Sequence, residues 1–305
     1  MNGALIIDKP EGITSHDAVA RIRRAAGTRR VGHAGTLDPF ATGVLVVCLG
    51  QATRLMQFLV GLDKEYIATV RIGFATDTQD VTGKQITPLR TSKELSLEEI
   101  TSALNQFVGR QLQTPPMYSA KKVGGERLYK AAREGREIER QPAEIEIYSI
   151  NLETSDGDWF RENEDGSRDF VISVRCSSGT YIRTLANDLG ERLGVGAHLA
   201  ALRRTAVGHF EISRAITLEE LESLAPERLS EAIISPADTI AHLPATHLNS
   251  DDARMVANGR AIELKEEIEG FVIRLLDEKG NLLAVGEIDS ERRVIKPRIV
   301  LMREV

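Results

Sequence analysis

The sequence predicts a protein of the α/β (α+β) class, in which strands and helices alternate along 305 residues. Lys64 to Ile72 alternates apolar and polar residues like a half-exposed strand, and Val44 to Leu49 is a continuous apolar run typical of a buried strand. Ser96 and Glu99 have the spacing of a capping box, which predicts that a helix begins there. With 42% hydrophobic residues, the chain can fill the core of one large domain and a smaller one.

The N-terminal elements follow from local signals. Gly3 to Ile7 is a short apolar strand, and the proline and glycine of residues 8–12 force a turn after it. Ser15 is expected to cap a helix that continues to about Ala26. After an irregular stretch and the buried strand, Gln51 to Leu59 is expected to form a short helix.

In the middle of the chain, the sequence pattern predicts two helices and a pair of strands. The expected bounds are Ser96 to about Phe107 and Arg127 to Glu134 for the helices, and Ala143 to Leu152 and Asp169 to Cys176 for the strands. The loop from Thr154 to Arg168 that joins these strands is acidic. Thr180 is expected to cap the next helix, which carries Arg183 in its first turns. A cation is unfavourable at that end of the helix dipole, so the position of Arg183 needs another reason.

The pattern of expected secondary structure changes at about Ala245, from mixed helices and strands to mainly short strands. Thr217 and Glu220 form another capping box, and Ala225 to Pro244 is interpreted as a connector. The expected elements beyond it are a helix near Asp251 to Asn258 and strands Gly270 to Leu276, Leu282 to Ile288 and Val294 to Met302. We therefore expect one domain over residues 1–244 and a second over residues 245–305.

The formal net charge of -6 argues mildly against a nucleic-acid partner, but the charge is segregated along the chain. Ala18 to Leu37 contains five arginines and no acid, and Arg110 to Arg140 has eight basic residues against four acidic ones. Glu144 to Asp169 has nine acidic residues and two arginines. Two basic segments and one acidic segment therefore remain compatible with an RNA-binding surface.

Targeting signals and metal motifs are not legible in the sequence. No leader pattern opens it and its apolar runs are too short to span a bilayer, so a cytoplasmic protein without membrane contact is expected. Cys48 and Cys176 lie in strand-like segments without Cys-x-x-Cys spacing, and we expect reduced core residues. The polar segment Phe74 to Gly83 lacks the ligand spacing of an EF-hand. It is expected to be hydrogen-bonded structure, so neither a metal nor a cofactor is predicted.

The stretch from Gly32 to Leu45 resembles neither core nor an ordinary linker. It holds three glycines, a proline, one histidine and a single carboxylate, that of Asp38. Because Pro39 favours extended backbone in the residue before it, Asp38 should be held on a shaped loop and could face a cleft. An isolated Asp-Pro pair more often marks a turn, so composition alone leaves a catalytic role open.

This stretch, which reads Gly-His-Ala-Gly-Thr-Leu-Asp-Pro followed by Ala-Thr-Gly at residues 41–43, resembles the central motif of the tRNA pseudouridine synthases of the TruB type. Asp8 to Ser15 also fits that family's first motif, Asp/Asn-Lys-Pro-x-Gly-x-Thr-Ser. The resemblance extends from Gly3 to Arg204, and more weakly beyond Ala245. It implies the pseudouridine synthase fold, a mixed and mainly antiparallel sheet with flanking helices and a central cleft, followed by a small PUA-like β-barrel.

The resemblance also implies the catalytic residues. Asp38 is the catalytic carboxylate, Arg183 pairs with it, and Tyr66 stacks on the target base. An arginine beside the carboxylate should lower its pKa by roughly one to three units. Without the resemblance, a tyrosine on a strand such as Tyr66 is more often a packing residue, and Leu202 could equally be a plain core leucine.

Further residues of the family's motifs bind or support the substrate. An insertion over about residues 113–142 is expected to close over RNA like a thumb. The implied binding residues are His33, which fills the gap left in the RNA loop, Tyr181 and Leu202, which line the base pocket, Lys9, which braces the catalytic loop, and Lys121 and Lys122, which reach phosphates.

The reaction implied is conversion of the T-arm uridine of tRNA (tRNA position 55) to pseudouridine after base flipping, without a cofactor. Asp38 would form a covalent adduct with the sugar or take its 2′ proton to give a glycal, and both routes stay open. The expected partner is the tRNA T-arm stem-loop, bound by a monomer without an obligatory protein partner.

Two alternative functions were weighed. A guide-dependent, dyskerin-like pseudouridine synthase shares these motifs, but this sequence lacks lysine-rich tails and keeps the insertion. A non-catalytic RNA-binding or RNA-folding protein is the other alternative, and Asp38 argues against it.

Overall fold

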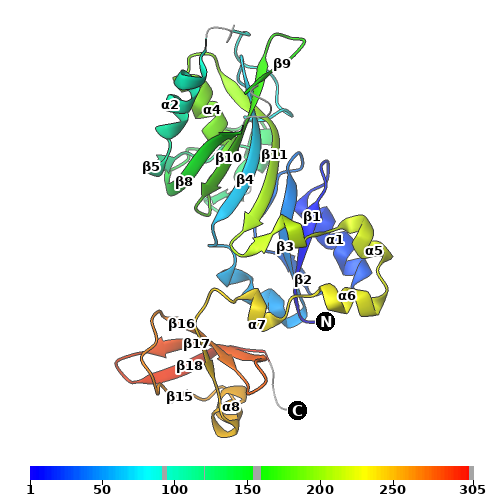
Figure 1. The fold of residues 1–305 in the computed structure, drawn as a ribbon, viewed down its shortest axis with the longest axis vertical. Helices are drawn as coiled ribbons and strands as arrows, with labels where there is room; N and C mark the ends of the chain where they lie inside the picture. Colours follow the sequence, from blue (N-terminus) through cyan, green and yellow to red (C-terminus); the bar gives the residue numbers. More distant parts are fainter. Residues whose placement is uncertain (91–94, 120, 154–158, 302–305) are drawn as a thin grey trace.

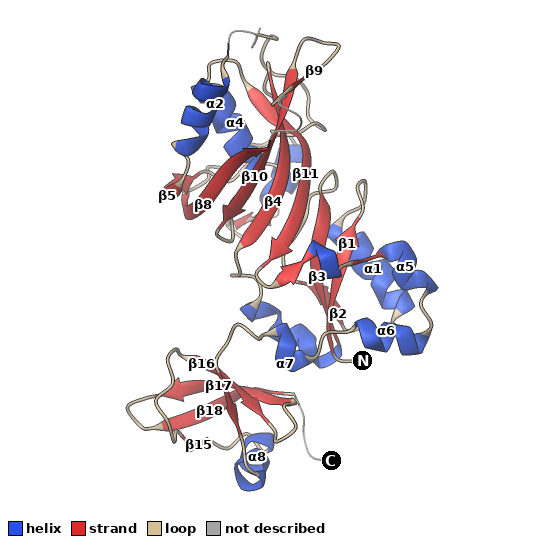
Figure 2. Ribbon diagram, viewed as in Figure 1, coloured by secondary structure: helices blue, strands red, loops and turns tan. Residues whose placement is uncertain are grey.

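The computed structural model describes residues 1–90, 95–119, 121–153 and 159–301. Within these residues the molecule is elongated, with a large sheet and its helices at one end and a small sheet at the other (Figure 1). Helices and strands are interleaved along the chain (Figure 2), which confirms the α/β (α+β) class. Three predicted features extend outside the described residues: the insertion at residue 120, the acidic loop at 154–158 and the last strand at residue 302.

The large sheet has the strand order β13-β1-β3-β11-β4-β10-β8-β5, with β2, β9 and β12 paired at its margins. The β1–β13 and β3–β11 pairs are parallel and the other pairs are antiparallel, so the expected mixed, mainly antiparallel sheet is confirmed. Its strands are β1 (Gly3–Lys9), β2 (Val31–His33), β3 (Thr42–Leu49), β4 (Lys64–Ile72), β5 (Gly109–Gln113), β8 (Ala143–Glu153), β9 (Arg161–Glu162), β10 (Arg168–Cys176), β11 (Ala197–Val207), β12 (Phe210–Glu211) and β13 (Ile216–Thr217).

The parallel pair β3–β11 marks the middle of this sheet. Arg203 lies opposite Thr42 and Arg204 lies opposite Gly43. Because the loop that carries Asp38 leads directly into β3, the fold places it beside the strand junction. Gly43 is required there, since its φ is 99° and a Cβ atom would lie 2.2 Å from the carbonyl oxygen of Arg204.

Helices α1, α2, α4 and α5 pack on one face of the large sheet, and η1 and α7 pack on the other face of β1 and β3. α4 packs on β4 and β11, α2 packs on β8 and α4, and α1 packs on β2 and α5. Val19, Ile22 and Ala26 recur at helical spacing, and all three are buried against the sheet. The helices are α1 (Ser15–Ala25), η1 (Gly50–Phe58), α2 (Leu97–Asn105), α3 (Leu128–Arg133), α4 (Ile182–Arg192), η2 (Ile212–Arg214), α5 (Leu218–Ser223), α6 (Pro226–Ala232), α7 (Pro236–Thr239) and α8 (Ser250–Ala257).

Capping residues were predicted with mixed success. The capping boxes at Ser96 with Glu99 and at Thr217 with Glu220 are confirmed. The N-cap predicted for α1 is wrong, because Thr14 accepts the hydrogen bond from the Asp17 backbone N–H. Ser15 already lies inside α1 and is buried, and its hydroxyl forms hydrogen bonds with the backbone of Leu37 instead.

Two helical predictions also need correction. η1 is a 3-10 helix, although its position matches the helix expected over Gln51 to Leu59. The connector predicted over Ala225 to Pro244 contains α6 and α7. Both begin with a proline, whose fixed φ suits a first helical turn.

The C-terminal sheet has the order β14-β16-β17-β18-β15 and is accompanied by α8. It forms a half-barrel consistent with a PUA-like domain. The strands are β14 (Ala245–His247), β15 (Ile262–Glu263), β16 (Val272–Leu276), β17 (Leu282–Asp289) and β18 (Val294–Val300). A small hairpin, β6 (Lys122–Val123) with β7 (Glu126–Arg127), lies in the insertion together with α3.

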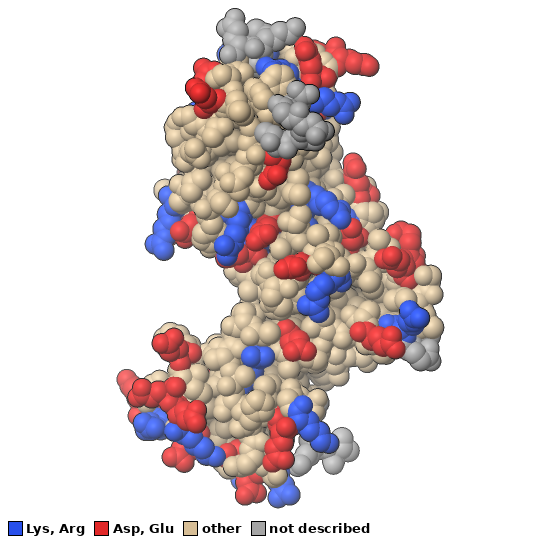
Figure 3. Space-filling model, in the orientation of Figure 1, with Lys and Arg blue, Asp and Glu red and all other residues tan. Residues whose placement is uncertain are grey.

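The small sheet shares a hydrophobic cluster with the large one. Leu276, Leu282 and Val285 of the small sheet pack in the same cluster as Val44 and Leu55. The contact is reinforced by a hydrogen bond of 2.6 Å from Arg54 Nη1 to the carbonyl oxygen of Val300. The two sheets therefore adjoin, and Figure 3 shows an indentation of the surface beside their contact.

Many of the charged side chains lie at the surface (Figure 3), and the two cysteines lie in the core. On the face drawn in Figure 3, basic and acidic side chains are interspersed. Cys48 and Cys176 are buried free thiols, as predicted, and burial raises the pKa of Cys176 to about 11. In the part of the chain that the structure describes, no helix is long and apolar enough to cross a membrane.

Candidate active site

The loop that carries Asp38 is held by the N-terminal segment of the chain. Ser15 Oγ donates to the carbonyl oxygen of Leu37 at 3.1 Å and accepts from the Leu37 N–H at 2.9 Å. The N–H of Gly12 donates to the carbonyl oxygen of Pro39 at 2.8 Å. Both neighbours of Asp38 are therefore fixed by hydrogen bonds, which restricts where its carboxylate can point.

Lys9 braces the same loop from inside the protein. Its side chain is fully buried, and Nζ donates to the carbonyl oxygens of Pro10, Ile13 and Pro39 at 2.7, 2.9 and 3.4 Å. Burial lowers its pKa to about 8. Because Lys9 has no exposed surface, its position fits support of the loop and not direct contact with RNA.

Arg183 lies in the first turn of α4 and contacts Asp38. Its Nε is 2.9 Å from Oδ2 of Asp38, and its Nη1 is 3.5 Å from Oδ2 of Asp80. Nη1 also donates to the carbonyl oxygen of Thr78 at 3.1 Å, and Nη2 donates to that of Tyr118 at 2.8 Å. These partners explain why an arginine occupies a helix start where the dipole disfavours it.

Asp80 was not predicted as a site residue. One of its oxygens, Oδ1, accepts from Thr78 Oγ1 at 2.8 Å, and from Thr82 N and Oγ1 at 3.0 and 2.5 Å. The expectation that this polar loop is hydrogen-bonded structure is confirmed. The other oxygen is thereby directed towards Arg183.

The electrostatics of Asp38 differ from the expectation. Burial raises the pKa of Asp38 above its ordinary value, the Arg183 guanidinium lowers it, and the Asp80 carboxylate raises it again. The predicted effect of Arg183 has the right sign, but the predicted net lowering is wrong because burial outweighs it. The Asp38 side chain keeps 34% of its surface accessible, against 4% for Arg183, since it faces a cavity.

That cavity has a volume of about 250 Å³. It is lined by the site residues that the sequence singled out as catalytic or base-binding: Asp38, Tyr66, Tyr181, Arg183 and Leu202. They come from the loop that carries Asp38, from β4, from α4 with its N-cap, and from β11. Tyr66 is 9% exposed and burial raises its pKa, so its phenol is neutral at physiological pH.

Tyr181 is positioned by a residue that sequence reasoning missed. The predicted cap, Thr180, is wrong: Tyr181 is the N-cap of α4, without a side-chain cap bond. The amide of Gln113 instead accepts from the Tyr181 N–H at 2.8 Å and donates to its carbonyl oxygen at 3.0 Å. Gln113 ends β5 at the start of the insertion, and pairing over such a sequence distance leaves no local signal.

Several predicted binding residues lie outside the lining of this cavity. They are His33, Lys9, Lys121 and Lys122. His33 ends β2, with its ring edge-on to that of His16 at 5.5 Å, and burial lowers its pKa. Lys122 is exposed on β6 of the insertion.

Lys64 and Arg204 line the cavity and were also missed. Lys64 Nζ donates to the carbonyl oxygens of Val60 and Leu62 at 2.7 and 2.5 Å, and burial lowers its pKa to about 8. The period of a strand could have found both residues, since Lys64 shares a face with Tyr66 and Arg204 shares one with Leu202.

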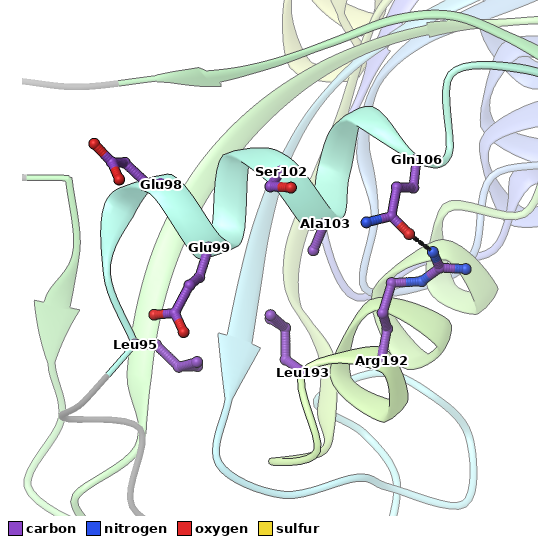
Figure 4. Close-up of a pocket in the computed structure, with 8 residues that line it drawn as sticks. All are labelled: Leu95, Glu98, Glu99, Ser102, Ala103, Gln106, Arg192 and Leu193. Carbon is purple, nitrogen blue, oxygen red and sulfur yellow. Dashed lines mark hydrogen bonds between the residues drawn. The ribbon is translucent and has the colours of Figure 1, made fainter.

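A separate hollow lies between α2 and the end of α4. In Figure 4, Glu98 and Glu99 project from α2, while Gln106 and Arg192 are joined by a hydrogen bond. None of the residues drawn there belongs to the Asp38 cavity. Within the described residues, no group of three His, Cys, Asp or Glu side chains is arranged to hold a metal ion.

Family models match nearly the whole chain. Residues 23–182 match the TruB family pseudouridylate synthase N-terminal domain. Residues 183–241 match the tRNA pseudouridylate synthase B C-terminal domain, and residues 244–301 match the C-terminal domain of pseudouridine synthase II TruB.

Similar proteins and structures agree with these matches. The chain is 47% identical to the tRNA pseudouridine synthase B of Geotalea uraniireducens over 85% of this chain and 80% of that one. It is 38% identical to the Bacillus pumilus protein of the same name, over 100% and 99%. A crystal structure of the archaeal box H/ACA Nop10-Cbf5 complex matches with a TM-score of 0.71 and 25% identity, covering 99% of this chain and 86% of that one. The chain therefore belongs to the TruB family of tRNA pseudouridine synthases, which are isomerases.

Proposed function

We propose that this protein converts the T-arm uridine of tRNA, at tRNA position 55, to pseudouridine. The single observation that carries the proposal is the carboxylate of Asp38, held 2.9 Å from Arg183 in a cavity that Tyr66 also lines. Relatives that bear the name tRNA pseudouridine synthase B support tRNA as the substrate. The loop around Asp38 matches the family's central motif residue by residue.

The chemistry requires the target nucleotide to leave the RNA stack. Extrusion costs a few kcal/mol, and stacking on an aromatic ring returns about 1–3 kcal/mol per base. Tyr66 would receive the flipped base, with Tyr181 and Leu202 on other walls of the cavity. Asp38 then faces the sugar, where it attacks C1′ or removes the 2′ proton.

Asp38 must be ionised for either route. Its burial opposes ionisation, and Arg183 favours it. Arg183 is itself fixed by Asp80 and by two backbone carbonyl oxygens. This preorganisation keeps the charged carboxylate oriented towards the cavity, with no rearrangement needed during the reaction.

The remaining predicted residues are proposed to dock the RNA. The insertion over about residues 113–142 would close over the T-arm, with Lys121 and Lys122 contacting phosphates. His33 would fill the space that the flipped nucleotide leaves. Residues 1–244 would form the catalytic domain, and the PUA-like domain over residues 245–305 would contact more distant parts of the tRNA.

We further propose that the protein acts in the cytoplasm as a monomer, without guide RNA or another protein. The guide-dependent alternative is favoured by one observation, the likeness to proteins of box H/ACA complexes. The higher identity to the tRNA pseudouridine synthase B relatives favours the stand-alone reading.

The test is to incubate the purified full chain with an unmodified tRNA transcript and to map pseudouridine by position. We expect conversion at position 55 without any added RNA or protein, and none in a transcript with cytidine there. Asp38→Asn should lower the rate by at least about 10³-fold while tRNA affinity is retained, and the exposed Asp251→Asn should react normally. Conversion that needs a guide RNA, or full turnover by Asp38→Asn, would overturn the proposal.

A further inference from the structure

We propose that Arg204 is a further catalytic residue, whose buried guanidinium stabilises the negative charge that the uracil ring acquires when its bond to C1′ breaks. The inference rests on the proposed function and adds a group to the site. Arg204 would stabilise the negative charge of the departing base, as Arg183 stabilises the negative charge of Asp38.

The fold places Arg204 next to the ring that would receive the base. In the β11–β4 ladder Arg204 is directly opposite Tyr66, so the two side chains project from the same face of the sheet. Leu202 lies two residues earlier on the same face, and all three residues line the Asp38 cavity. The guanidinium also interacts with the Tyr66 hydroxyl and opposes the rise in pKa that burial causes there.

The guanidinium is held rigidly by the catalytic loop and β3. Nε donates to the carbonyl oxygen of Val44 at 2.8 Å, Nη1 to that of Thr36 at 3.4 Å and Nη2 to that of Gly35 at 3.1 Å. Each terminal nitrogen carries a second hydrogen that these bonds do not use. The Tyr66 hydroxyl interacts with the guanidinium as well, which leaves Arg204 one donor in a fixed position at the lining of the cavity.

Arg204 is a buried cation without a counter-ion among the residues that the structure describes. The residue is 2% exposed, and among the described residues its guanidinium forms no ion pair within 4 Å of a carboxylate. Burying a charge without a partner is costly, and neutral donors could satisfy the same carbonyl oxygens. A positive charge is therefore retained where the cavity would hold the base.

The effect of this charge is visible on its neighbours. After burial, Arg204 is the next cause of the lowered pKa of Lys64, and it also lowers the pKa of Lys9 and His33. Its field disfavours cations and favours anions around the cavity. Lys64 also lines the cavity, but its ammonium group is bound by the carbonyl oxygens of Val60 and Leu62 and so does not compete with Arg204 for the anion.

An anion is the species that both reaction routes produce. If Asp38 attacks C1′, the electron pair of the N1–C1′ bond leaves with the base while an ester bond forms at the sugar. If Asp38 takes the 2′ proton, the C2′–H electron pair forms the double bond of the glycal and the N1–C1′ pair again leaves with the base. The uracil anion spreads this charge over N1, O2 and O4. When its C5 later bonds to C1′, the ester bond breaks and Asp38 leaves as a carboxylate, or, in the glycal route, C2′ takes back the proton from Asp38. The ring is then neutral, and transfer of a proton from C5 to N1 completes pseudouridine. A preorganised donor at that anion is worth about 10²–10³ in rate.

The experiment compares two substrates in single-turnover reactions at saturating enzyme. One is the unmodified T-arm stem-loop, and the other carries 5-fluorouridine at the target position. Fluorine makes the uracil anion a better leaving group, so it reduces the need for a stabilising cation. Loss of the target nucleoside is followed by chromatography and mass spectrometry after nuclease digestion.

Arg204→Met should slow the loss of uridine by about 10²–10³-fold. The corresponding slowing for 5-fluorouridine should be smaller by a factor of about ten or more. Arg204→Lys keeps a cation and should show a smaller deficit with both substrates. Arg203→Met, the adjacent arginine paired with Asp8 at 2.7 Å, should change both rates equally. The thermal midpoint of each variant separates misfolding from slow chemistry.

Equal deficits for the two substrates in Arg204→Met would overturn the inference and reduce Arg204 to a clamp on the loop. Failure of the wild-type protein to convert either substrate would instead overturn the proposed function. If Arg204→Met unfolds, Arg204→Lys still decides the question. Its deficit must then be smaller with 5-fluorouridine than with uridine, because a displaced ammonium replaces the guanidinium only partly.

Discussion

Asp38 and Asp80 contact the same guanidinium, with oxygens 2.9 and 3.5 Å from nitrogens of Arg183. Asp80 is 5% exposed and its other oxygen is fully engaged by threonines, whereas Asp38 keeps a third of its surface towards the cavity. The two acids therefore differ in task. Asp80 fixes Arg183, and Arg183 fixes the carboxylate of Asp38.

Arg183→Met should move the acid limb of the pH-rate profile to higher pH. Arg183 lowers the pKa of Asp38, so its removal raises that pKa and reduces the ionised fraction at a given pH. Asp80→Asn should shift the limb to lower pH, because Asp80 raises the pKa of Asp38. Single-turnover rates between pH 5 and 9 measure both shifts, and shifts in the same direction would contradict the electrostatic account.

Asp38→Asn should stabilise the folded protein at neutral pH. Burial raises the pKa of Asp38 in the folded state, so the wild type loses stability relative to the neutral asparagine as pH rises. The gain should be absent below the ordinary carboxyl pKa of about 4 and complete above the folded-state pKa. Thermal midpoints of the two proteins across that range test this, and a gain at low pH alone would show that the sign is wrong.

Tyr66→Leu should lower kcat/KM more than Tyr66→Phe. Leucine removes about 1–3 kcal/mol of stacking, which corresponds to roughly tenfold to a hundredfold in rate. Phenylalanine keeps the ring and loses only a hydroxyl whose raised pKa leaves it neutral. We expect nearly unchanged tRNA affinity for Tyr66→Phe in a filter-binding assay, and a strong loss of affinity would place Tyr66 in docking instead.

Gly43→Ala should destabilise the fold by more than about 3 kcal/mol. Its φ of 99° is strained for alanine, and the new Cβ would meet the backbone of Arg204. Gly27→Ala is the matched control, since its φ is 60° and nothing lies within 4 Å of the added atom. Gly27→Ala should cost only about 1 kcal/mol in chemical denaturation, and equal losses would argue against the close strand contact.

Local signals were sufficient for most elements of the fold. The alternation in Lys64 to Ile72 matches β4 residue for residue, because a half-buried strand requires that period. Ser15 shows where such reasoning stops. It has the chemistry of a helix cap, but a long-range bond to Leu37 engages its hydroxyl while Thr14 takes the cap.

The site was predictable where the motif is contiguous and not where it depends on distant strands. Asp38, Tyr66 and Arg183 meet at one cavity as expected. Arg204 could have been found from the strand period that it shares with Leu202, whereas Gln113 escaped prediction because its partner, Tyr181, lies far away in the sequence. The net pKa of Asp38 was misjudged for the same reason, since the depth of its burial depends on the whole fold.

The hydrophobic cluster shared by the two sheets has a consequence for how the molecule can be divided. Leu276, Leu282, Val285 and Ile299 complete a core that also contains Ala4, Ile6 and Val46. Truncation at residue 244 would therefore remove the apolar side chains that cover β1 and leave this strand prone to aggregation. Because side chains of the small sheet complete that core, the small and the large sheet should unfold together in a single cooperative transition.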